Sequence, residues 1–259
     1  MSTETRVSPW TRIGALVRLN TALMFREPGP IASRLFMPLI MITVLLPLYR
    51  AALAGSGDQA GASQTVAGML VMFSLLALSI VGSAILTERQ WHTWDRQRAT
   101  PAAAWELLLG KAVPACGVLA AQQVLIIGFG SFVFGLRVSA LGLVGLVVAV
   151  WVLTLLCLGM ALGAFARSHS ELAVFYDLGG ITLTVLGGAL LPLSMMPGWA
   201  RAIAPVSPGY WAMRALQAAL AEHLAVLLQS IGILLVLALA AGSVACYRIT
   251  RGWGRSRLM

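Results

Sequence analysis

Charged side chains are scarce in this 259-residue sequence. Only 10% of its residues are Asp, Glu, Lys or Arg, whereas 59% are hydrophobic, and the mean hydropathy is +0.88. A soluble domain carries about 25% charged residues, so 18 basic and 9 acidic side chains are too few to cover a water-soluble globule of this length. We therefore expect lipid to be the solvent for most of the chain.

Cysteine and histidine are also few, and neither is grouped for chemistry. The three cysteines form no C-x-x-C pair and lie inside apolar runs, which excludes a disulfide framework. The histidines, His92, His169 and His223, are scattered over different predicted loops. We therefore predict no metal site and no catalytic residue.

Lysine occurs once, and its surroundings exclude one kind of nucleotide site. Lys111 follows Gly110 but precedes Ala112, and no glycine stands five places before Gly110. The phosphate-binding loop G-x-x-x-x-G-K-[ST] is therefore missing. We therefore predict that the chain is not an enzyme and that it binds no cofactor of its own.

Long apolar runs are what the sequence has in abundance. The hydrocarbon core of a membrane is about 30 Å thick and a helix rises about 1.5 Å per residue, so a crossing needs about 20 residues. Six runs reach about that length: 35–53, 64–86, 107–136, 141–166, 172–193 and 224–247. We predict an all-α integral membrane protein with six transmembrane helices in one domain, residues 31–259. Five crossings are the alternative, if Pro114 or the glycine pairs 179–180 and 187–188 break a span into a re-entrant pair.

The basic residues predict the orientation of these runs. Fourteen cations lie before the first run, after the second and fourth runs, and in the C-terminal tail, whereas four lie in the other connections. Because positive flanks stay inside, both termini should be cytoplasmic, and a bacterial inner membrane is compatible with this pattern. No basic stripe is interleaved with aromatics, so the net charge of +9 does not indicate nucleic-acid binding.

Residues 1–30 are predicted to form a cytoplasmic connecting segment with an amphipathic helix from Trp10 to Arg26. Ile13, Val17 and Met24 fall on one side of that helix. Three arginines, Arg12, Arg18 and Arg26, share the other side. Such a helix lies on the inner leaflet, and the alternative is a solvated basic tail.

The cytoplasmic connection 88–106 mixes both signs of charge with three tryptophans. Thr100-Pro101 is typical of a helix start. A short helix loaded with Trp and Arg has the composition of a docking surface for a partner protein. An interfacial aromatic belt beside a solvated charge run is the alternative, and the residues alone leave both open.

The segment 187–222 is predicted to be extracellular and re-entrant. Four prolines within seventeen residues break any single helix, yet the stretch stays apolar. It is either a plug over a pathway or a cap without a gate. The candidate gate residues are Pro192, Met195, Met196 and Pro197.

A few polar residues lie inside the predicted spans. Asp177 would cost a few kcal/mol near the bilayer centre, so it should face protein or water, as a pathway contact or as an interhelical hydrogen bond. Gln122, Gln123 and Thr182 are further pathway candidates. They could equally join helices without contacting a substrate.

The two interrupted regions resemble the ABC transporter type-2 permease family. The connection is similar to that family's pattern E-R-x-x-G-T-x-E-x-x-x-x-T-P-x-x-x-x-E-x-x-x-G-K, although His92 stands where the family usually has glycine. The stretch from Pro192 through Pro197-Gly198-Trp199 to Tyr210 is similar to its outer signature. The resemblance covers nearly the whole chain, and is nearest to bacterial drug and antibiotic exporters of the daunorubicin-resistance type.

This resemblance implies a mechanism and partners. Two ATPase subunits on separate chains would bind ATP and Mg and grip the connection, and a second permease copy would complete a homodimer. An amphipathic substrate would then move outward by alternating access. The implied coupling residues are Glu88, Arg89, Thr93, Trp94, Asp95, Arg96, Arg98, Thr100, Pro101 and Glu106.

Three other functions compete with this one. A permease for polysaccharide or a lipid-linked glycan is related by the same resemblance. An ATP-independent carrier or channel would need polar residues recurring at mid-span, and Asp177 is the one plausible acid there. An intramembrane transferase would need His, Asp or Glu gathered at one depth, which the scattered positions do not provide.

Overall fold

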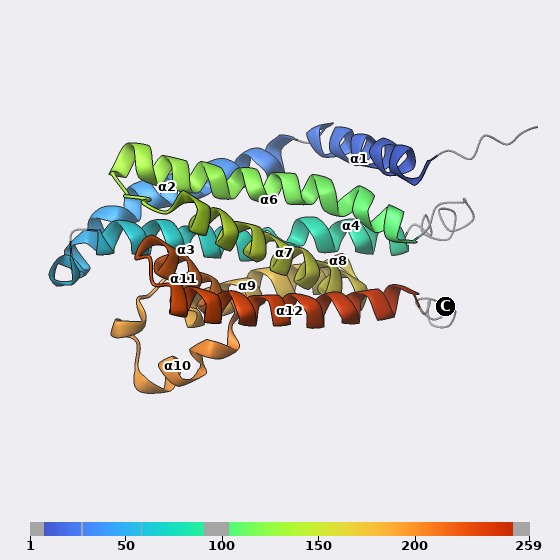
Figure 1. Ribbon diagram of the computed structural model, residues 1–259. Coiled ribbons are helices and arrows are strands. Elements are labelled where there is room, and N and C mark those ends of the chain that lie inside the picture. The colour runs from blue at the N-terminus through green and yellow to red at the C-terminus, as the bar shows by residue number, and fades with distance from the viewer. Residues whose placement is uncertain (1–7, 27, 58, 91–103, 251–259) are drawn as a thin grey trace, which may run out of the picture.

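The computed structural model describes residues 8–26, 28–57, 59–90 and 104–250, and every regular element in these ranges is helical (Figure 1). The helices run lengthwise beside one another in a bundle. The α-helices are α1 (Pro9–Arg26), α2 (Pro28–Ala52), α3 (Ala60–Leu76), α4 (Leu78–Gln90), α6 (Ala104–Phe134), α7 (Leu141–Phe165), α8 (His169–Val174), α9 (Gly180–Leu186), α10 (Gly198–Ile203), α11 (Pro208–Leu220) and α12 (Leu224–Thr250). Short 3-10 turns lie at Ala54–Ser56, Leu193–Met195 and Ala204–Val206, and a π-helical turn at Phe175–Gly179.

Five helical stretches are long and apolar enough to cross a membrane. They are Ile31–Ala52, Ala60–Thr87, Leu109–Phe134, Leu141–Phe165 and Leu224–Arg248. Each overlaps one of the six predicted runs, and the second joins α3 to α4 across Ala77. The chain is thus a multi-pass membrane protein by the length and composition of its helices.

The fifth predicted run, 172–193, is not among these stretches. The chain is instead divided there into α8, the π-helical turn and α9, and the helix ends at Leu186. Asp177 is an acid inside this run. Beyond Leu186 the backbone leaves the helix, and Gly188 has a φ of +79°, a conformation that glycine adopts far more readily than residues with a side chain.

The broken stretch still leads the chain back along the bundle. In Figure 1, α7 and α12 both run toward the end where α1 begins, and α8 lies near that same end. α9 leads from α8 toward α10 and α11, at the opposite end, where α12 starts. The described chain therefore begins and ends at one end of the bundle, as the charge pattern predicts for two termini on one side.

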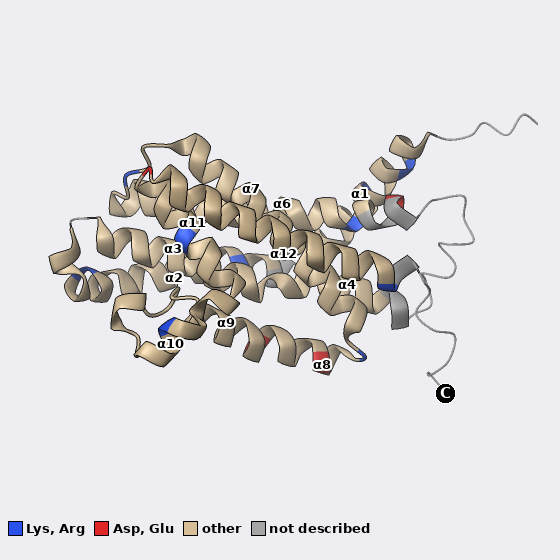
Figure 2. Cartoon of the chain, turned by 60° about the horizontal axis from the view of Figure 1, so that its bottom comes forward, with Lys and Arg blue, Asp and Glu red and all other residues tan. Residues whose placement is uncertain are grey.

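The core is centred on α3. Its buried side chains include Val66, Met69 and Leu75, and the helix packs against α2, α6, α9 and α11. By contrast, α2 and α12 leave large apolar side chains such as Phe36, Val44 and Leu239 exposed. Blue and red segments lie mainly toward the ends of the bundle in Figure 2. An apolar belt between charged ends matches a lipid environment.

Glycines bring α4 and α7 into close contact. A Cβ at Gly163 on α7 would lie 2.7 Å from the backbone oxygen and 2.9 Å from the Cα of Gly82 on α4. The hydroxyl of Tyr176 fills the space beside Gly82. Small residues at such crossings let backbones approach closely, which is the main source of packing energy between helices in lipid.

We expect Gly163→Ala to destabilise the bundle by about 1–3 kcal/mol, because its methyl group would press on backbone atoms that cannot yield. Thermal melting of the purified chain in detergent measures this. Gly145→Ala on the same helix is the control, since nothing lies within 4 Å of a Cβ there. Equal melting temperatures for the two variants would show that the crossing tolerates the extra volume.

Candidate functional site

The predicted coupling connection lies mostly outside the described residues. Glu88 and Arg89 are in the last turn of α4, and Glu106 is in the first turn of α6. Seven predicted coupling residues fall outside the described ranges: Thr93, Trp94, Asp95, Arg96, Arg98, Thr100 and Pro101. The ends of α4 and α6 lie together at the end of the bundle where α1 begins (Figure 1).

Glu106 is held by an ion pair with α1. Its side chain is buried, with 2% of the residue exposed. Arg12 contacts both carboxylate oxygens: Nε lies 3.1 Å from Oε2, and Nη2 donates to Oε1 over 3.1 Å. Two parallel contacts to one carboxylate fix both the distance and the orientation of the two helices.

One turn further along, α1 and α6 meet closely. The Cβ of Leu16 lies 2.6 Å from where a Cβ of Gly110 would be. Nδ2 of Asn20 donates to the backbone oxygen of Gly110 over 3.1 Å, and also to the oxygen of Leu16 over 2.9 Å. We define Arg12, Leu16, Asn20, Glu106 and Gly110 as the α1–α6 clamp. Its contacts hold α1 against the start of α6.

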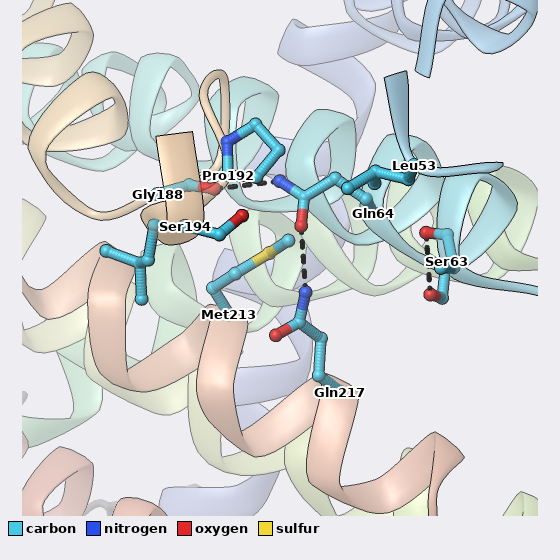
Figure 3. A pocket seen from close by; sticks show the side chains of 10 residues that line it. Leu53, Ser63, Gln64, Gly188, Pro192, Ser194, Met213 and Gln217 are labelled. Atoms are coloured by element: carbon cyan, nitrogen blue, oxygen red, sulfur yellow. Dashed lines mark hydrogen bonds between the residues drawn. The ribbon is translucent and has the colours of Figure 1, made fainter. Parts of the chain in front are cut away.

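The segment 187–222 is tied to α3 by amide hydrogen bonds. Nε2 of Gln64 donates to the backbone oxygen of Gly188 over 2.8 Å, and Nε2 of Gln217 donates to Oε1 of Gln64 over 2.9 Å (Figure 3). The hydroxyl of Tyr49 on α2 donates to the backbone oxygen of Leu190. Two helices, α2 and α3, therefore hold the segment that the sequence predicts to be re-entrant, and α11 within that segment bonds to α3 through Gln217.

Beside this network lies a cavity of about 280 Å³. Its wall comes from the start of α3, from the stretch after Gly188 and from α11. Figure 3 shows Gln64, Gln217 and Met213 pointing toward one another beneath Pro192 and Ser194. The cavity combines amide and hydroxyl groups with apolar atoms, which suits a small polar group or water better than a large apolar molecule.

The predicted gate residues do not gather around this cavity. Pro192 lines it, whereas Met195 is 45% exposed and Pro197 is exposed as well. Met196 is buried, but it is not among the lining residues. The structure therefore places one of the four predicted residues at the cavity.

The other predicted pathway residues occupy two kinds of position. Gln122 and Gln123 on α6 are buried, where their amides contact α2 and α3. Asp177 and Thr182 are exposed on the broken stretch. Within the described residues no hydrogen bond or ion pair joins these two pairs, so they do not form one site. Within those same ranges no three His, Cys, Asp or Glu side chains lie close enough to hold a metal ion.

The sequence profile of the ABC-2 type transporter family matches residues 11–221, from within α1 to just past α11. The chain belongs to the ABC-2 type transporter family. The predicted resemblance is thereby confirmed.

Two relatives of this ABC-2 chain are the probable multidrug ABC transporter permeases YbhR of Escherichia coli strain K12 and of Escherichia coli O157:H7. Each is 23% identical to it over 145 residues, a stretch that covers 55% of this chain and 39% of the relative. The chain thus spans well under half the length of these relatives.

Reasoning from the sequence missed most partners in this ABC-2 chain. It placed Arg12 on the polar side of α1 but did not pair it with Glu106, and it singled out neither Gln64 nor Gln217. One signal was available for the clamp. Glu106 is an acid at the start of a helix, and the distant N-terminal helix carries basic residues that could pair with it. Nothing local in the sequence relates Gln64 to Gln217, which are 153 residues apart.

We expect Arg12→Gln to loosen α1, because it leaves the buried carboxylate of Glu106 without its cation, at a cost of about 3 kcal/mol. Hydrogen exchange of the α1 amides should accelerate in the purified protein. Arg18→Gln is the matched control, since Arg18 is exposed on the same helix. If both variants exchange alike, the ion pair does not hold α1 in place.

Proposed function

We propose that this chain is the membrane subunit of an ABC exporter that moves an amphipathic drug, antibiotic or lipid-like molecule outward, powered by separate ATPase subunits. The α1–α6 clamp is the observation that carries the proposal. It joins the amphipathic N-terminal helix to the residue where the connection 88–106 ends. A force on that connection would reach both helices at once.

In this proposal the ATPase supplies the chemistry and the permease supplies the path. Two ATPase copies bind ATP and Mg and press on the connection, including the seven coupling residues outside the described ranges. Family membership supports an ATPase partner. The two relatives are named as probable multidrug permeases, which favours a drug-like substrate.

We infer six crossings and a homodimer for the assembled protein. The five long apolar stretches, together with the return path through α8 and α9, give an even number, which supports both termini being cytoplasmic in a bacterial inner membrane. In this arrangement residues 187–222 lie at the outer end, where hydrogen bonds from Gln64 and Tyr49 hold the re-entrant segment over the bundle. Alternating access would open and close that end.

Coupling is tested by expressing the chain with its ATPase, identified as the product of a neighbouring gene. We expect the two to copurify, and the double variant Trp94→Ala, Arg96→Glu to lose at least about tenfold of its transport rate, since aromatic and arginine anchors dominate most docking surfaces. Arg137→Glu, in a connection predicted to lie outside, is the control. An unchanged rate in the double variant, or no association, would contradict docking through the connection.

Orientation is tested with single cysteines in a variant whose Cys116, Cys157 and Cys246 are replaced by alanine. We expect a membrane-impermeant maleimide to label Ser194→Cys in intact cells, and Thr100→Cys only after the cells are opened. Labelling of Thr100→Cys from outside would invert the topology and remove the proposed ATPase contact.

A further inference from the structure

A half-buried arginine inside the first span has no role in the function proposed above. Arg34 is the fourth residue of the stretch Ile31–Ala52 and is half-buried. Its Nη2 donates to Oγ of Ser79 on α4 over 2.7 Å. Ser79 lies eight residues before the end of its own span at Thr87, or about 12 Å of helix rise. The guanidinium is therefore turned into the bundle and does not extend toward the nearby helix end, as arginines at membrane borders usually do.

This charge lacks a counter-ion in the part of the chain that the structure describes. The ion pair there is Arg12–Glu106, at the α1–α6 clamp. A cation within a membrane span is costly unless an anion or several polar groups surround it. A single hydroxyl from Ser79 leaves most of the five guanidinium N–H donors available.

Two buried amides lie on the neighbouring helix α6. Nε2 of Gln122 donates to the backbone oxygen of Arg34 over 3.3 Å, and Nε2 of Gln123 donates to Oγ of Ser74 over 2.5 Å. Gln122 is 1% exposed and Gln123 is fully buried, and Oε1 of each has no hydrogen-bond partner among the described residues. Buried acceptors of this kind are rare because each costs about 1–3 kcal/mol.

The donors and acceptors complement one class of headgroup. A guanidinium binds a phosphate or carboxylate, whereas an amide oxygen accepts from a hydroxyl or amine and repels an anion. A diacyl phosphodiester that carries a polyol supplies both kinds of group and has acyl chains for the exposed apolar faces of α2. A purely cationic or uncharged amphiphile would leave Arg34 unpaired.

We propose that Arg34, Gln122 and Gln123 bind the headgroup of an anionic amphiphile that also carries a hydroxyl or amine donor. The source is either a membrane lipid that stays bound or the molecule that is exported. The site deepens the proposed function by naming the chemistry of a substrate, and that part rests on the proposed function. Binding itself does not require an ATPase.

Binding is measured on the purified full-length chain in neutral detergent, by native mass spectrometry with phosphatidylglycerol or phosphatidylcholine. We expect phosphatidylglycerol to bind more tightly, and Arg34→Gln to weaken it at least tenfold. Arg34→Lys should retain part of the affinity, which separates lost charge from lost folding. The control is Arg201→Gln, because Arg201 is an exposed arginine in the segment 187–222. Equal affinity of Arg34→Gln and the unchanged chain for phosphatidylglycerol would overturn the site.

The amide contribution is measured with phosphatidylmethanol, which has the phosphate but no free hydroxyl on its headgroup. The unchanged chain should prefer phosphatidylglycerol over it severalfold, and Gln122→Leu should remove that preference while leaving phosphatidylmethanol binding intact. A preference that survives in Gln122→Leu would overturn the role of the amide.

The two sources are distinguished in proteoliposomes that contain the chain, its ATPase and acyl-labelled phosphatidylglycerol with an unmodified headgroup. ATP-dependent movement that Arg34→Gln abolishes identifies a transported lipid. Tight binding without movement identifies a resident lipid, and both outcomes support the site. If the ATPase fails to associate, the proposed function fails while the binding result stands.

Discussion

The structure depends on one constraint: a polar group within the bundle must find its partner inside the protein, because the outer helix faces are apolar. Side chains meet this requirement by bonding to backbone oxygens of neighbouring helices. The hydroxyl of Thr154 on α7 reaches the oxygen of Leu234 on α12, and Gln64 on α3 reaches Gly188. Such contacts add direction to helix packing that is otherwise driven by shape.

The same constraint separates the charged residues into two groups. At the end where α1 begins, Arg12 forms an ion pair with the buried carboxylate of Glu106, and this pair holds α1 against α6. Arg34 lies further along the bundle and meets hydroxyl and amide groups but no described acid. The ion pair of Arg12 and Glu106 therefore stabilises the fold, whereas the charge of Arg34 would be stabilised by an anionic ligand.

The sequence predicted the parts of the fold that depend on local composition. All five long apolar stretches and the N-terminal helix follow from hydropathy and periodicity. The fifth run was predicted as one span; in the structure it contains a π-helical turn and leaves the helix before Gly188, whose φ of +79° glycine adopts readily. Partners far apart in sequence, such as Arg12 with Glu106 and Gln64 with Gln217, depend on how helices pack, and local patterns carry little of that information.

Two long helices, α6 and α3, are enough to connect the two ends of the bundle. α6 begins at the clamp with Glu106 and, about 25 Å further on, contacts Ser74 of α3 through Gln123. α3 in turn carries Gln64, which holds the segment 187–222 at Gly188. Because α3 is the most buried of the long helices, it cannot shift without its neighbours. If the connection 88–106 displaced α6, the displacement would therefore reach the segment 187–222 through packed helices. No flexible element between α6 and that segment would be needed.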